Sequence, residues 1–173
     1  MQPLVLQLVG HSGSGKTTLI TQLVENLTAK GYRVGTIKHH HRELEMDTVG
    51  KDSWSHRKAG ATLVSLVGQN QTAIYYPFTY SLTEVLVHYQ SMDLVLVEGY
   101  KQESFAKWAI LKPGENIDWV KALTQIQAIV ASEPMPKVPW PVYYAQELSP
   151  MVQTLTNQLA IRTGRDEGTE SQW

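Results

Sequence analysis

Eight residues near the start of the chain, from Gly10 to Thr17, constrain the fold more than any other segment. Their sequence, GHSGSGKT, matches the pattern G-x-x-x-x-G-K-[ST] at every fixed position. Gly13 and Gly15 have a reason to be glycine, because side chains there would stop consecutive backbone N–H groups from closing around an anion. Such a loop also needs a buried strand before it and a helix after it, whose first N–H groups point at the same anion.

Both flanking elements are predicted. Residues 4–9 form an apolar run that only Gln7 interrupts, which is typical of a buried strand. Apolar residues then recur every three or four positions across residues 19–27, and Gly31 is placed to end that helix. Residues 33–38 are predicted to be the next strand, and this order favours a right-handed parallel unit. We therefore expect an α/β fold of the P-loop NTPase type, a mostly parallel twisted sheet with helices on both faces.

The rest of the chain continues this alternation. Patterning predicts a short helix at 52–59, a hairpin at 62–67 and 72–76, a helix at 81–90 that opens with a Ser81/Glu84 capping box, a buried strand within 93–101, strands near 108–111, 126–131 and 142–144, and a helix at 149–161. Residues 1–161 are interpreted as one domain, and the polar residues 162–173 as a mobile C-terminal tail.

Composition narrows the possible partners. The formal net charge is −1, so no broad basic field exists to attract nucleic acid or an anionic membrane. The chain has no cysteine, which excludes disulfides and thiolate metal sites, so any metal must have oxygen or imidazole ligands. No apolar run approaches the roughly 18 residues of a membrane span. We expect a cytoplasmic protein.

The glycine-rich motif predicts a site for nucleoside triphosphate. Lys16 is expected to bridge the β and γ phosphates and to be the catalytic residue, and the Thr17 hydroxyl is expected to bind Mg²⁺. The residues of the motif predicted to bind the nucleotide are Gly10, Ser12, Gly13, Ser14, Gly15, Lys16 and Thr17.

Glu98 is the candidate for a second acidic group at this site. It ends the apolar run of residues 94–97, and an acid at the end of a buried strand can contact the metal through water. Aspartate is the commoner residue there. The alternative is that Glu98 caps a neighbouring helix or pairs with Lys101.

The long polar segment after residue 38 is a candidate switch or partner surface. Residues 47–50, DTVG, match the D-x-x-G pattern of GTPases, although no apolar strand precedes them. A loop after the second strand would nevertheless face the γ phosphate. The alternative for these residues is a solvated polar face. For the histidines at 39–41 there are two interpretations, a polar loop or contact of one of the rings with a ligand. The candidate residues are His39, Asp47, Lys51, Asp52, Arg57 and Lys101.

Two absences bear on specificity. The sequence has no N-K-x-D or T-K-x-D motif, so guanine selection cannot be derived from it. Small-molecule kinases usually stabilise the transferred phosphoryl group with lid arginines, and no arginine lies between Arg57 and Arg162.

Five segments together carry a resemblance to a known family: GHSGSGKTTL at the loop, KHHH at 38–41, DTVGKDS at 47–53, RKAGA at 57–61 and LVLVEGYK at 94–101. In this order, across about residues 4–135, they resemble the molybdopterin-guanine dinucleotide biosynthesis adaptor protein B family.

The resemblance implies a dimeric GTP-binding protein with weak GTPase activity. It implies a partner, the guanylyltransferase that attaches GMP to molybdopterin, and leaves molybdopterin itself open as a further partner. It also implies that residues 13–18, Thr18 included, hold the phosphates, that Thr17 and Glu98 hold Mg²⁺, and that 47–57 is the switch or partner surface. Two alternatives remain open, an ATP-dependent small-molecule kinase and an interaction module that binds no nucleotide.

Overall fold

The computed structural model describes residues 2–40 and 47–164. Its internal contacts divide the chain into two compact units, residues 1–39 with 87–173, and residues 40–86. The first unit contains β1 (Leu4–Val9), α1 (Lys16–Ala29), β2 (Val34–Lys38), the 3₁₀ turn η1 (Val87–Tyr89), β5 (Leu94–Glu98), β6 (Ala106–Ile110), α4 (Asp118–Lys121), β7 (Ile126–Ala131), β8 (Val142–Tyr144) and α5 (Leu148–Thr163).

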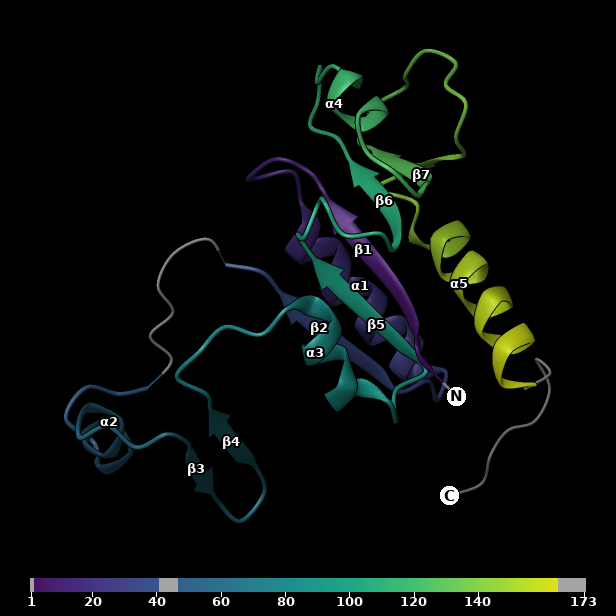
Figure 1. Cartoon of the computed structure of the whole chain (residues 1–173). Helices are drawn as coiled ribbons and strands as arrows, with labels where there is room; N and C mark the ends of the chain where they lie inside the picture. The colour runs from purple at the N-terminus through teal and green to yellow at the C-terminus, as the bar shows by residue number, and fades with distance from the viewer. Residues whose placement is uncertain (1, 41–46, 165–173) are drawn as a thin grey trace. The chain divides into compact units, whose positions relative to one another are not determined.

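A six-stranded parallel sheet forms the first unit, in the strand order β2-β5-β1-β6-β7-β8. β1 therefore lies inside the sheet, with β5 on one side and β6 on the other (Figure 1). Because all strands run the same way, the residues that follow β1, β2, β5, β6 and β7 gather at one edge. The expected fold class is confirmed.

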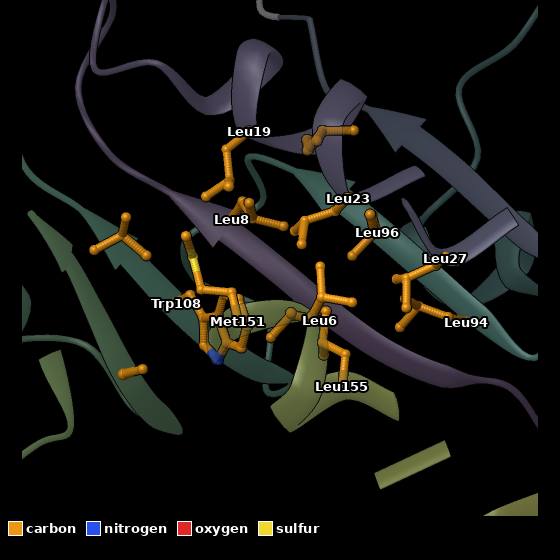
Figure 2. Close-up of a cluster of buried hydrophobic side chains, with 14 of the residues drawn as sticks. Leu6, Leu8, Leu19, Leu23, Leu27, Leu94, Leu96, Trp108, Met151 and Leu155 are labelled. Carbon is orange, nitrogen blue, oxygen red and sulfur yellow. The ribbon is translucent and has the colours of Figure 1, made fainter. Parts of the chain in front are cut away.

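Helices α1 and α5 cover one face of this sheet. Leucines of α1 pack on the leucines of β1 and β5, and Met151 and Leu155 of α5 reach the same layer beside Trp108 (Figure 2). Leu23 and Leu27 are completely buried there. The four-residue spacing of the α1 leucines places them on one side of the helix, so their burial holds α1 against β1.

The opposite face has a second, smaller core. Val9 of β1, Ala109 of β6 and Ile129 of β7 pack there with Val120 of α4. The sequence analysis did not predict α4, because a four-residue helix is too short to show helical periodicity.

Two polar side chains, Gln7 and Lys107, are buried on this opposite face of the sheet. Gln7 Nε2 donates to the carbonyl oxygens of Gly99 and Tyr100, at 3.2 and 2.6 Å. Lys107, its neighbour on β6, donates to the carbonyl oxygens of Phe105 and Glu103. Burial lowers the pKa of Lys107, and nearby Glu103 opposes that shift. Together the two side chains anchor the loop that joins β5 to β6, which explains why a glutamine interrupts the apolar run of β1.

The second unit contains α2 (Asp52–Lys58), the antiparallel pair β3 (Val64–Val67) and β4 (Thr72–Tyr75), and α3 (Leu82–Leu86). The helix and hairpin predicted here are present, and the capping box forms: the Ser81 N–H donates to Glu84 Oε2 at 2.8 Å and the Glu84 N–H to Ser81 Oγ at 3.3 Å. The helix predicted for 81–90 is α-helical only to Leu86. It tightens into η1, which brings the Tyr89 hydroxyl to the Thr36 carbonyl oxygen at 2.9 Å.

At the C-terminus α5 runs two residues past the predicted end and stops at Gly164, whose φ is +67°. Residues 165–173 lie outside the described residues, so the mobile tail stays a prediction, as does the single domain over 1–161. None of the helices in the described parts of the chain has the length and apolar character needed to span a bilayer.

Gly35 in β2 offers a test of this packing. A Cβ on Gly35 would lie 2.4 Å from Tyr89 Cδ1, a ring atom that cannot swing away freely. Gly35→Ala is expected to lower the free energy of unfolding by about 1–3 kcal/mol, measured by urea titration. Gly68→Ala is the control, since its Cβ would approach only the Gln71 carbonyl oxygen, at 3.4 Å. Equal effects of the two substitutions would contradict the close contact.

Candidate functional site

The glycine-rich loop joins β1 to α1 in an anion-binding geometry. Gly13 and Gly15 have φ values of +75° and +87°, which side chains disfavour. Gly15 is the N-cap of α1, and no side chain caps this helix end. The first N–H groups of α1 are therefore directed at the loop with the positive end of the helix dipole behind them, an arrangement that binds phosphate.

Lys16 lies folded over this loop. Its Nζ donates to the carbonyl oxygens of Gly10 and His11, at 3.1 and 2.8 Å, and approaches Ser14 Oγ at 3.5 Å. The pKa of Lys16 is lowered chiefly by burial; Glu98 raises it, and three further lysines lower it: Lys101, Lys38 and Lys112. A polyanion bound in the loop would stabilise the ammonium form.

Thr17 and Glu98 meet beside the loop. Thr17 Oγ1 donates to Glu98 Oε2 at 3.0 Å, and Glu98 Oε1 lies 3.4 Å from Lys38 Nζ. Of the alternatives for Glu98, an ion pair is present, but with Lys38 and not with Lys101. The hydroxyl and carboxylate oxygens are ligands that suit Mg²⁺, directly and through water. The described residues contain no cluster of three or more His, Cys, Asp or Glu side chains, so phosphate and water would complete the shell.

Lysines gather around the loop from three other strand ends. Lys38 ends β2, Lys101 follows β5 and Lys112 follows β6. Lys112 lies over the loop, since a Cβ on Gly13 would be 4.0 Å from its Nζ. The sequence analysis assigned no role to Lys38 or Lys112. Each is a charged residue at or just after the carboxyl end of a predicted strand, and this position could have marked it as a candidate. Only the strand order shows that these strand ends meet.

The loop also contacts the segment after β6, which the sequence analysis did not connect to it. His11 Nδ1 pairs with Glu115 Oε1, and the His11 ring lies edge-on to Trp119 at 5.1 Å between centroids. Lys101 Nζ lies 4.9 Å from the centre of the same Trp119 ring. Burial would raise the pKa of Glu115, but hydrogen bonds from the Lys112 N–H and the His11 ring lower it below its usual value.

His39 lies at the end of β2, beside Glu98. Its N–H donates to the Glu98 carbonyl oxygen at 3.0 Å, and its ring stacks on Tyr100, with centroids 4.3 Å apart and planes at 30°. Tyr100 has a φ of +53°, and Gln7 holds its carbonyl oxygen. His41 lies outside the described residues, so the interpretation of the three histidines as a group stays a prediction.

Four of the switch candidates lie in the second unit: Asp47, Lys51, Asp52 and Arg57. Asp47 Oδ1 accepts hydrogen bonds from the Thr48 N–H at 2.9 Å and from Ser53 Oγ at 2.8 Å, and its Oδ2 lies 3.6 Å from an Arg57 guanidinium nitrogen. Lys51 and Asp52 line a cavity of about 640 Å³ with Asp47. The sequence candidates are therefore brought together within this unit. Their role as a switch or partner surface stays a prediction.

Residues 5–132 match the model of a family described as molybdopterin guanine dinucleotide synthesis protein B. The chain is 42% identical over 107 residues to a Haemophilus influenzae protein and 38% identical over 119 residues to an Escherichia coli protein, both named molybdopterin-guanine dinucleotide biosynthesis adapter protein. The matches cover 60% and 64% of this chain, and 60% and 66% of those proteins.

A solved structure agrees. The crystal structure of the MobB protein homolog from Bacillus stearothermophilus superposes with a TM-score of 0.73 at 31% identity, over 91% of this chain and 99% of that one. The resemblance found in the five sequence segments is thus confirmed. The chain belongs to the molybdopterin guanine dinucleotide synthesis protein B family.

Proposed function

We propose that this protein is a GTP-binding adaptor of molybdenum cofactor biosynthesis. It acts in the cytoplasm with the guanylyltransferase that attaches GMP to molybdopterin, and it hydrolyses GTP slowly at most. The names of the related Haemophilus influenzae and Escherichia coli proteins support the assignment to this pathway. The observation that carries the nucleotide part is the uncapped start of α1 facing a loop over which Lys16 is folded.

In this proposal each side chain has a separate task. The amides of residues 13–18 hold the phosphates, and Lys16 balances charge on the β and γ phosphates. Mg²⁺, held by the Thr17 hydroxyl and by Glu98 through water, would supply further neutralisation of phosphate charge. Glu98 is already engaged by Thr17 and Lys38, so it is a poor general base for the attacking water. Slow hydrolysis is what such a site would give.

The kinase alternative has less support. The cations that act on Lys16 in the first unit are lysines, from strand ends of the sheet, and the sequence between Arg57 and Arg162 supplies no lid arginine. The third alternative is a module that binds no nucleotide. A direct measurement of GTP binding distinguishes it from the proposed function.

Lys16→Ala tests the phosphate site. Wild-type protein at GTP concentrations 100 times the dissociation constant should gain about 2.7 kcal/mol of stability, measured as a thermal shift. The variant should lose this shift and keep the melting temperature of the nucleotide-free protein, because Lys16 is not part of the core. A variant that binds GTP as wild type does would show that the site is assigned wrongly.

Glu98→Gln tests the metal assignment. The amide keeps the size of the side chain but removes its charge, so more Mg²⁺ should be needed to reach half of the GTP-induced thermal shift, by about tenfold. Glu25→Gln, on the exposed side of α1, is the matched control and should titrate as wild type does. An unchanged Mg²⁺ midpoint in Glu98→Gln would remove this residue from the metal site.

The proposal includes a homodimer, and the β3–β4 hairpin supports it. Two strands alone are marginally stable in water. Register places Val67 and Ile74 on one face of the hairpin, and these side chains are 80% and 51% exposed. Apolar side chains on such a face are typical of a protein contact.

Sedimentation velocity tests the assembly. The chain should sediment as a dimer of about twice 19.5 kDa, and as a larger species with the molybdopterin guanylyltransferase. Val67→Lys with Ile74→Lys should give the monomer, because two ammonium groups would be desolvated in the contact. Ile161→Lys, at an equally exposed apolar residue of α5, should leave the dimer intact. A wild-type monomer at micromolar concentration would contradict the proposal.

A further inference from the structure

A cavity of about 390 Å³ lies at the carboxyl ends of β6 and β7. Two segments line it, residues 111–117 after β6 and residues 131–138 after β7. Its walls combine apolar groups such as Leu111, Met135 and Val138 with a few polar ones. This volume and composition fit a small-molecule site, and the position, outside the carboxyl ends of parallel strands, is where α/β sheets bind ligands.

The orientation of a bound triphosphate points toward this cavity. Thr17 and Glu98, the pair suited to the metal, lie on the β5 side of β1. A Mg²⁺ held by this pair would neutralise the terminal phosphates, so we expect the γ end of the nucleotide on the β5 side. The α phosphate and the nucleoside must then extend to the other side of β1, where β6 and β7 lie.

Contacts across that side connect the phosphate loop to the cavity. Lys112 lies over the loop at Gly13 and also lines the cavity. Glu115, another lining residue, pairs with His11 of the loop. Lys112 and Glu115 thus belong both to the wall of the cavity and to the surroundings of the phosphate loop.

Two carboxylates line the cavity, and they differ in free bonding capacity. Glu115 is engaged at both oxygens, by His11 and by the Lys112 N–H. Glu133 uses one oxygen, which accepts from the Gly114 N–H at 2.5 Å, and its Oε2 has no hydrogen-bond partner within the described residues. The Gly114 N–H therefore positions the Glu133 carboxylate, and Oε2 is left to accept a hydrogen bond from a ligand.

We propose that this cavity holds the guanine base and that Glu133 selects it. The inference rests on the proposed GTP site and assigns its base specificity. Guanine presents two adjacent donors, N1–H and the 2-amino group. Glu133 Oε2 can accept one of them, and Oε1 can accept the other beside the Gly114 N–H, because each carboxylate oxygen has two lone pairs. Adenine presents an unprotonated N1 at the same edge, which would face the negative charge of Glu133. Guanine selection then needs no N-K-x-D motif.

Calorimetric titration with GTP, ITP and ATP tests this assignment. ITP lacks only the 2-amino group, so wild-type protein should bind it about tenfold more weakly than GTP, since hydrogen bonds to charged groups are the stronger class. Glu133→Ala should weaken GTP binding about tenfold or more while leaving ITP within about threefold of GTP. Glu133→Gln, which keeps the size but not the charge, should also reduce the preference for GTP.

Glu25→Gln is the matched control and should keep the wild-type ratio of GTP to ITP affinity. Glu133 is exposed, so the nucleotide-free melting temperature of its variants should match that of wild type. If GTP binds and Glu133→Ala keeps the wild-type ratio, the base assignment is overturned and the proposed function stands. If wild type binds no triphosphate at all, both are overturned.

Discussion

Backbone N–H groups converge at the start of α1, and this convergence sets the geometry of the candidate site. Those amides serve an anion only if α1 is held at a fixed position relative to the end of β1. Buried leucines such as Leu23 and Leu27 supply that position by packing α1 on the sheet. The loop is equally confined on its other side, because a Cβ on Gly10 would meet the Ile110 carbonyl oxygen at 2.5 Å. The packing of the core therefore fixes the position of the candidate site.

Buried polar groups also fix the position of the loop that joins β5 to β6. Gln7 and Lys107 occupy core positions on β1 and β6, where apolar residues would pack without needing partners. Burying such groups is costly unless they are hydrogen-bonded, and both are bonded to carbonyl oxygens of residues 99–105. This loop follows Glu98 directly. The polar residues inside the sheet thus help to fix the acid proposed for the metal.

Local charge and net charge differ in this protein. The whole chain is close to neutral, yet Lys38, Lys101 and Lys112 all act on Lys16 at one edge of the sheet, with Glu98 as the opposing charge. Such a cluster can attract a compact polyanion such as a triphosphate without creating the broad basic field that binds nucleic acid. Burial and these like charges lower the pKa of Lys16 in the free protein. The negative charge of a bound triphosphate would offset both effects.

Elements with a local sequence signal could be predicted from the residues alone. The phosphate loop, the buried run before Glu98 and the leucine spacing of α1 each depend on neighbours within a few residues, so their type and most of their bounds could be predicted. α4 and the change to a 3₁₀ turn after Leu86 could not, since short elements carry no periodicity. The tertiary structure alone decided which strand ends meet: Lys38 beside Glu98, Lys112 over Gly13, and Glu115 against His11. The members of these three pairs are 60, 99 and 104 residues apart in the sequence, in that order. Their contact depends on the strand order, which no local pattern encodes.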